Sequence, residues 1–142
     1  MTSWLIDTDI LSEVLKGKDQ TVAQNFKAAI AAGGEIFISS VTVYEILYGL
    51  HSRRATSQLG HFAQFLFDQI ELTPTRSDYR LAAKIRAELR IAGSPIGSAD
   101  PLIAATALST GSVLVTGNVR HYAAIQSVGF DIVLIDWRSP PP

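Results

Sequence analysis

The strongest constraint on the fold of this chain is an alternation between two kinds of hydrophobic pattern. Five short and mostly apolar runs, rich in branched side chains, recur at residues 4–6, 36–38, 70–72, 113–115 and 132–135. Such runs are typical of strands that are buried on both faces of a parallel sheet. Between them, apolar residues recur every three or four positions, as in helices that pack on a sheet.

The helical segments have their own start and stop signals. Val22, Phe26, Ala29 and Ile30 share one helical face, and glycines follow them at residues 33 and 34. Similar stripes occupy residues 59–66 and 81–89, and a fourth helix runs from about residue 100 to 108 before a glycine at residue 111. Strand–helix alternation of this kind predicts an α/β fold with three layers, α/β/α, around a central parallel sheet of about five strands.

The length and composition of the chain predict one domain. Its 142 residues suit a single core, which we assign to residues 1–137, with a proline-rich C-terminal tail at residues 138–142. Cysteine is absent, which excludes disulfides, thiolate nucleophiles and cysteine-based zinc sites. No apolar run approaches the ~20 residues that span a bilayer, and the N-terminus does not look like an export signal. We therefore expect a cytoplasmic protein without a membrane partner. The net charge of −1 permits a nucleic-acid substrate without predicting one.

Oxygen-bearing side chains gather where strands end and helices begin. Asp7 and Asp9 follow the first strand, and Glu45 lies shortly after the second. Asp100 opens the fourth helix, and Asn118 follows the fourth strand. Ligands of parallel α/β sheets bind outside the carboxyl ends of the strands, so these residues mark a candidate site. Asn118 also suits a turn or a helix cap.

The acidic residues each have a structural alternative as well. Asp7 is a suitable N-cap for the helix that follows it. Thr42 and Glu45 have the spacing of a capping box, and Asp100 followed by Pro101 is typical of an N-cap with proline at the first helical position. As a set they indicate more, because carboxylates gathered at one edge repel one another unless a cation compensates them. Oxygen ligands without cysteine favour Mg²⁺ or Mn²⁺ over zinc, and such ions assist phosphate chemistry.

Four segments at these positions resemble the PIN-domain family, and within it the VapC-like toxin ribonucleases. They comprise residues 5–13 with Asp-Thr-Asp after a strand, 38–49 with Ser-x-Val-Thr-x-x-Glu, 96–107 with Asp-x-x-Ile-Ala-Ala-Thr-Ala, and 114–122 with Val-Thr-x-Asn. Each motif alone is moderately specific, whereas all four in order are a strong signal. The segments span nearly the whole chain.

The resemblance implies a set of roles for these residues. Asp7, Glu45, Asp100 and Asn118 would be the catalytic residues, with Asp7 and Asp100 as direct ligands of Mg²⁺, or of Mn²⁺. The protein would be an endoribonuclease that cleaves structured RNA by in-line attack of metal-activated water, leaving 5′-phosphate and 3′-hydroxyl ends. It would be the toxin of a type II pair. A cognate antitoxin would insert a segment into its active-site groove, and the toxin would form a homodimer.

Two positions depart from the family pattern. Many members carry an aspartate at the position of Asn118, which brings an oxygen but no charge. We hypothesise that Asp9 compensates, since many relatives have asparagine there. Pro101, directly after the third acidic residue, is unusual and strengthens the capping interpretation of Asp100 without excluding a metal role.

Two other functions fit part of the sequence. Asp7-Thr8-Asp9 resembles the nucleophile motif of haloacid-dehalogenase-type phosphatases, although Ile10 and Leu11 follow where that motif has a small residue and then Thr or Val. A catalytically silent PIN-like interaction module is the second alternative, because Asn118 replaces an acid.

The remaining charged and aromatic side chains suit contacts with RNA, the protein surface or the core. Cations that could contact RNA phosphates near the site are Lys16, Lys18, Arg53, Arg54 and Arg120. The face formed by Arg76, Arg80 and Lys84, with a predicted Lys84–Glu88 ion pair, is predicted to be plain surface. The aromatic residues at 62–67 suit either a core or a contact for a partner helix. The three histidines lack the spacing of zinc ligands.

Overall fold

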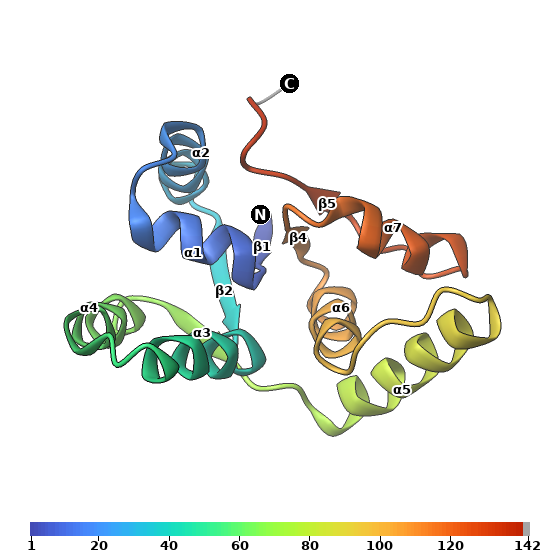
Figure 1. Cartoon of the computed structure of the whole chain (residues 1–142). Coiled ribbons are helices and arrows are strands. Elements are labelled where there is room, and N and C mark those ends of the chain that lie inside the picture. The colour runs from blue at the N-terminus through green and yellow to red at the C-terminus, as the bar shows by residue number, and fades with distance from the viewer. Residues whose placement is uncertain (141–142) are drawn as a thin grey trace.

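The computed structural model describes residues 1–140 and confirms the α/β fold around a five-stranded parallel sheet (Figure 1). The strand order is β3-β2-β1-β4-β5. Its members are β1 (Ser3–Ile6), β2 (Glu35–Ser39), β3 (Ile70–Leu72), β4 (Val113–Val115) and β5 (Leu134–Ile135). The central strand β1 pairs in parallel with both β2 and β4, so its carboxyl end lies at the middle of the sheet edge.

Within residues 1–140, seven helices cover the two faces of the sheet (Figure 1). One face packs against α1 (Thr8–Lys16), α2 (Gln20–Ala31), α3 (Ser40–Ser52) and α4 (Thr56–Leu66). The other packs against α5 (Arg76–Ile91), α6 (Ala99–Thr110) and α7 (Val119–Ser127). Neighbouring side chains of β1 divide between the two cores, Leu5 into one and Ile6 into the other, as the alternation of a strand requires. The predicted three layers are therefore present.

Two of the strand predictions need correction. Strand β3 is not buried on both faces: it pairs only with β2, and Ile70 is 45% exposed. An edge strand has one neighbour and less cover, which explains the difference. Strand β5 is shorter than the run at residues 132–135, because the backbone N–H of Ile132 donates to the carbonyl of Phe130 in a tight turn.

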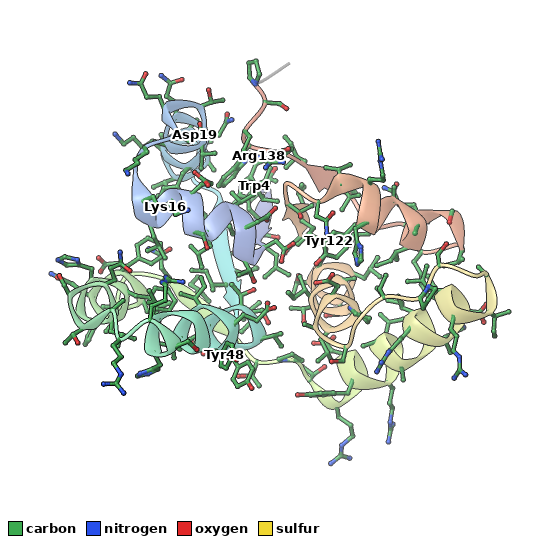
Figure 2. The ribbon with its side chains drawn as sticks, viewed as in Figure 1. Trp4, Lys16, Asp19, Tyr48, Tyr122 and Arg138 are labelled. Carbon is green, nitrogen blue, oxygen red and sulfur yellow. The ribbon has the colours of Figure 1, made fainter. Side chains whose placement is uncertain are left out.

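The C-terminal segment is held against the first core. Trp137 is 2% exposed, and its ring packs 5.6 Å from that of Trp4 and 6.2 Å from that of Phe26. The amide of Asn25 donates to the carbonyls of Trp137 and Ser139. These contacts place Arg138, labelled in Figure 2, near the sheet edge, where its Nη2 donates to the carbonyl of Gly117. The boundary between residues 137 and 138 stays a prediction, and residues 141–142 lie outside the described part of the chain.

None of the helices in residues 1–140 is long and apolar enough to cross a membrane.

Candidate active site

Asp7 is the central residue of the site. It follows β1 directly and caps α1, with an extended backbone (φ −72°, ψ 162°) and a side chain that accepts a hydrogen bond from the Thr8 N–H. Its second oxygen accepts a hydrogen bond of 2.9 Å from the Thr116 hydroxyl at the end of β4. Only 7% of the residue is exposed. The capping interpretation is therefore correct, and each carboxylate oxygen retains a further lone pair for a ligand.

The electrostatics of Asp7 show that its charge is poorly balanced. Burial raises the pKa of Asp7 from 3.8 to about 6, and the carboxylates of Asp9 and Asp100 add to the effect. Hydrogen bonds from Thr8 and Thr116 act in the opposite direction but do not offset it. A cation at this position would supply the balance that the hydrogen bonds do not.

Asp100 approaches Asp7 from a different helix. Its helix α6 begins at Ala99 after the N-cap residue Ser98, so Asp100 and Pro101 both lie in the first turn. The prediction that Asp100 is the N-cap is wrong, because the chain enters the helix two residues earlier. The Asp100 carboxylate lies 2.9 Å from Nε2 of His121, and its side chain is 29% exposed.

Tyr122 places an unpaired hydroxyl at the same point. The residue, labelled in Figure 2, is fully buried on α7. Among residues 1–140 its Oη has no hydrogen-bond partner of acceptable geometry. Burial, followed by the charges of Asp7 and Asp100, holds the pKa of Tyr122 far above its ordinary value, so the phenol stays protonated. The carboxylates of Asp7 and Asp100 are the neighbouring acceptors, so the hydroxyl can donate to either of them or to a ligand held between them.

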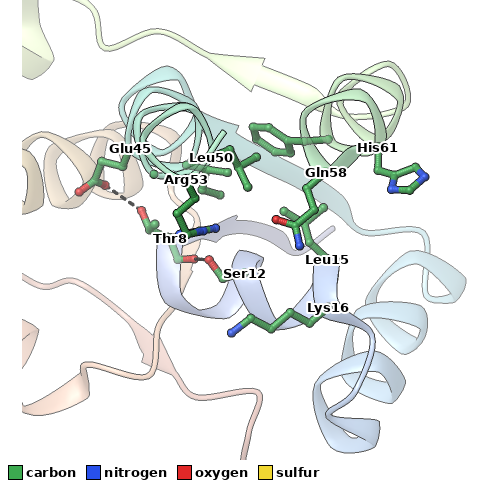
Figure 3. A pocket seen from close by; sticks show the side chains of 12 residues that line it. Thr8, Ser12, Leu15, Lys16, Glu45, Leu50, Arg53, Gln58 and His61 are labelled. Atoms are coloured by element: carbon green, nitrogen blue, oxygen red, sulfur yellow. Dashed lines mark hydrogen bonds between the residues drawn. The ribbon is translucent and has the colours of Figure 1, made fainter. Parts of the chain in front are cut away.

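Glu45 joins the site through Thr8. Its Oε1 accepts a hydrogen bond of 2.7 Å from the Thr8 hydroxyl, which links α3 to the residue after Asp7 (Figure 3). The predicted capping box of Thr42 and Glu45 is wrong, because α3 is capped by Ser39, whose hydroxyl accepts from the Val41 N–H. Glu45 is thus free of a capping role.

Asn118 lies at the margin of the site. Its position is the N-cap of α7, yet its side chain makes no capping hydrogen bond and the residue is exposed. The backbone N–H of Asn118 donates to the Thr116 hydroxyl. Within the described chain, no hydrogen bond connects the Asn118 amide to the carboxylates.

Asp9 contacts the backbone of the loop after β4. Its oxygens accept hydrogen bonds from the N–H groups of Ile10 and Gly117, at 2.8 and 2.9 Å. The Gly117 carbonyl accepts from Nη2 of Arg138, which also pairs with Asp136. Burial raises the pKa of Asp9, although these N–H groups and Arg138 oppose the shift. The hypothesis that Asp9 replaces a missing charge stays a prediction.

We call the contacts of Gly117 with Asp9 and Arg138 the Gly117 clamp. A Cβ atom at this position would lie 2.5 Å from Cζ of Arg138 and 2.6 Å from Oδ2 of Asp9. Glycine is therefore required for the close approach of the three residues. The clamp fixes the loop that carries Thr116, the partner of Asp7.

The arrangement suits a hard cation bound by few protein ligands. Across residues 1–140, no three histidine or acidic side chains converge closely enough to hold a metal by themselves. Mg²⁺ usually binds through one or two carboxylates, several waters and the phosphates of a substrate. Asp7 and Asp100, with the unpaired Tyr122 hydroxyl beside them, fit such an ion.

A cavity of about 300 Å³ opens beside Glu45, between α1, α3 and α4 (Figure 3). Its wall includes Thr8 and the predicted cations Lys16 and Arg53. Phe62 contributes an apolar surface, whereas Phe67 is 92% exposed and lies outside it. The cavity thus joins the acidic site to a mixed apolar and basic groove.

Four residues of the site were not found from the sequence: Thr8, Thr116, His121 and Tyr122. Thr8 lies between the predicted Asp7 and Asp9 at the end of β1, and Thr116 precedes Asn118 by two residues at the end of β4. His121 and Tyr122 come three and four residues after Asn118, the spacing that returns a helical side chain to the same face. This helical spacing from Asn118 is the sequence signal that places His121 and Tyr122 near the site. The spacing of zinc ligands does not include it.

Known proteins of similar sequence and fold belong to one family. The PIN-domain family model matches residues 4–126. The tRNA(fMet)-specific endonuclease VapC of Shigella flexneri is 31% identical over 130 residues, covering 88% of this chain and 93% of that protein. The DNA-bound VapBC structure from Salmonella typhimurium superposes with a TM-score of 0.81 at 28% identity, covering 96% of this chain and 99% of that one. The VapBC2 structure from Rickettsia felis, bound to a promoter DNA fragment, gives a TM-score of 0.84 at 23% identity, with coverage of 96% and 99%.

The chain belongs to the PIN-domain family. The resemblance to the VapC ribonucleases that the four motifs indicate is confirmed across nearly the whole chain.

Proposed function

We propose that this protein is a metal-dependent endoribonuclease and the toxin of a VapBC-like pair, acting in the cytoplasm. The observation that carries the proposal is the meeting of Asp7, Asp100 and the unpaired Tyr122 hydroxyl at the carboxyl edge of β1. The relatives named as VapC ribonucleases support hydrolysis of RNA as the reaction. Two of them are named tRNA(fMet)-specific, so tRNA is the first substrate to test.

Asp7 and Asp100 would hold the ion, Mg²⁺ or Mn²⁺. Such a bound ion would lower the pKa of the attacking water and neutralise negative charge on the scissile phosphate. The protein's contribution is to keep the Asp7 carboxylate oriented. Thr8 N–H and the Thr116 hydroxyl hold its two oxygens at 2.9 Å, so the carboxylate needs no rearrangement to receive a cation.

Glu45 and Tyr122 would act on protons near the scissile bond. Glu45 keeps one carboxylate oxygen free while Thr8 holds the other, and a carboxylate fixed in this way can accept a proton from water. Tyr122 keeps its proton because of its raised pKa, so its Oη can donate a hydrogen bond to a ligand held between the carboxylates. Asn118 would assist from the margin of the site as a neutral oxygen ligand.

The partners in this proposal are RNA, a cognate antitoxin and a second copy of the chain. Structures with similar folds are VapBC complexes, which supports an antitoxin that occupies the groove beside Glu45. The homodimer rests on the resemblance to VapC toxins and is tested by the solution mass. A phosphatase of the haloacid-dehalogenase type is not favoured, because the family match and the relatives all point to the PIN class.

Cleavage of tRNA and of total RNA, with Mg²⁺ or Mn²⁺ against EDTA, tests the proposal. Asp7→Asn and Asp100→Asn should lose metal-dependent cleavage, because each removes one of two charged ligands. Asp131→Asn, at an exposed aspartate outside the site, is the matched control and should retain it. If Asp7→Asn cut RNA as well as the control, the assignment of the site would be wrong. If the folded wild-type protein cut no RNA with either ion, the silent interaction module would replace it.

A further inference from the structure

The positive charge of this chain is concentrated on one helix. Helix α5 carries five of the twelve lysines and arginines: Arg76, Arg80, Lys84, Arg86 and Arg90. Against its two acidic residues, this gives the helix a net charge of +3, so the rest of the chain carries −4 to make the total of −1. An anionic macromolecule that approaches the protein is therefore attracted to α5 and repelled by the rest of the surface.

Nothing within the fold uses these charges. All five cations are exposed, and none forms an ion pair or a side-chain hydrogen bond with another of residues 1–140. The predicted Lys84–Glu88 ion pair is not formed. The surface is therefore not explained by the salt bridges that usually stabilise an exposed helix.

The spacing of the cations is unfavourable for the helix itself. Arg76, Arg80 and Lys84 follow one another at intervals of four, as do Arg86 and Arg90, so like charges lie one turn apart. Each such pair of like charges destabilises an isolated helix. Arg76 also lies in the first turn, where the helix dipole disfavours a cation. An external anion bound to these side chains would offset the repulsion between them.

The shape of the surface also suits a phosphate backbone. Ala83 and Ala87 are small and lie between the cations, and Arg86 and Arg90 line an open hollow of about 970 Å³. The hollow extends to Ile96, in the loop that leads into α6. Ile96 precedes Asp100 by four residues, which is at most about 14 Å of chain. The hollow is thus joined to the active edge by a short segment.

We propose that the exposed face of α5 anchors the RNA substrate, with Arg86 and Arg90 contacting phosphates away from the scissile bond. The inference rests on the proposed ribonuclease function and adds where the substrate is held. Tyr79, which is 55% exposed, lies seven residues before Arg86 on the same flank and offers a ring on which an unpaired base stacks.

The test compares Arg86→Gln/Arg90→Gln with Lys27→Glu, an equal change of two charges at an exposed position of α2. Binding of unfractionated tRNA is measured in an Asp7→Asn background, over a range of salt concentrations. The double variant should bind roughly tenfold more weakly, and the slope of log K against log salt should fall by about 2, because two phosphate contacts are lost. Lys27→Glu should leave the slope unchanged, and Arg86→Lys/Arg90→Lys should restore most of it.

Kinetics with tRNA in the active protein give a second readout. The double Gln variant should raise KM with little change in kcat, and its melting temperature should not fall, because a repulsive pair is removed. If wild type cleaves tRNA but the double Gln variant and Lys27→Glu bind it equally well, the proposal that α5 anchors RNA is wrong, whereas the proposed ribonuclease function is retained. If the Gln variant loses a dimer instead, α5 is an interface between copies and the anchor is wrong. Absence of cleavage by wild type defeats the proposed function and this inference with it.

Discussion

Replacing Asp7 by asparagine should make the metal-free protein more stable while it abolishes cleavage. The carboxyl has a pKa of about 6 in the fold against 3.8 in its ordinary state. At 1.36 kcal/mol per pKa unit, ionised Asp7 destabilises the fold by about 3 kcal/mol at neutral pH. Asparagine removes that charge and is an equally good N-cap, so the hydrogen bond from Thr8 N–H is kept.

The Asp7→Asn substitution loses one hydrogen bond, the one that the Thr116 hydroxyl donates to the carboxylate. The Thr116 hydroxyl donates to Asp7 and accepts from the Asn118 N–H, so an amide nitrogen facing it would leave its proton without an acceptor. Such a loss costs about 1 kcal/mol. The expected net gain is therefore about 2 kcal/mol, or about 4–8 °C in melting temperature for a domain of this size.

The gain should depend on pH in a defined direction. Between 3.8 and about 6 the folded protein binds the Asp7 proton more tightly than the unfolded chain does. This contribution to stability is fully present below pH 3.8 and is lost as the pH rises through about 6. The advantage of the asparagine variant should therefore be largest near neutral pH and should shrink toward about pH 4.

Urea unfolding in EDTA, at a series of pH values, measures both quantities. Asp131→Asn serves as the control for the loss of an exposed carboxylate. Adding Mg²⁺ should stabilise the wild type and not the Asp7→Asn variant, because a ligand stabilises only the fold that binds it. A variant less stable than wild type near neutral pH, or a difference that does not change with pH, would refute the electrostatic account of Asp7.

Three further substitutions separate the roles of the surrounding residues. Tyr122→Phe removes the unpaired buried hydroxyl, so urea unfolding should show equal or higher stability, whereas RNA cleavage should slow. Thr8→Val deletes the hydrogen bond to Glu45 and should lower kcat roughly tenfold with little change in melting temperature; an unchanged kcat would mean that Glu45 needs no orientation. Gly117→Ala forces Arg138 and Asp9 apart, which should cost about 1 kcal/mol in thermal unfolding and a larger fraction of the activity.

The architecture could be predicted from the sequence because it depends on periodicity. Short apolar runs and helical stripes differ in period, and glycines at residues 33, 93 and 111 stop the helices where the pattern does. The exposure of β3 could not be predicted in this way, because whether a strand is central or at an edge depends on the order of strands. Strand order is a long-range property that no local pattern contains.

The helix caps show why the functional residues were harder to assign. Thr42–Glu45 and Asp100–Pro101 both have the residue types of a cap, yet the helices begin earlier, after Ser39 and Ser98. A local rule cannot choose between two suitable serine or acidic residues when the strand or loop before the helix decides where it starts. The error matters, because a carboxylate that does not cap its helix is available to a ligand.

The hydrogen bonds around Asp7 indicate why a cation belongs there. Two neutral donors, a backbone N–H and a threonine hydroxyl, orient the carboxylate without cancelling its charge. Arg138 is a cation at the same edge of the sheet, but its guanidinium is held by Asp136 and by the Gly117 carbonyl. An arginine paired with Asp7 would lower the pKa of Asp7 and occupy the site permanently. Arg138 instead positions the loop that carries Thr116. The buried carboxylate of Asp7 therefore stays charged at neutral pH, oriented, and open to an exchangeable ion.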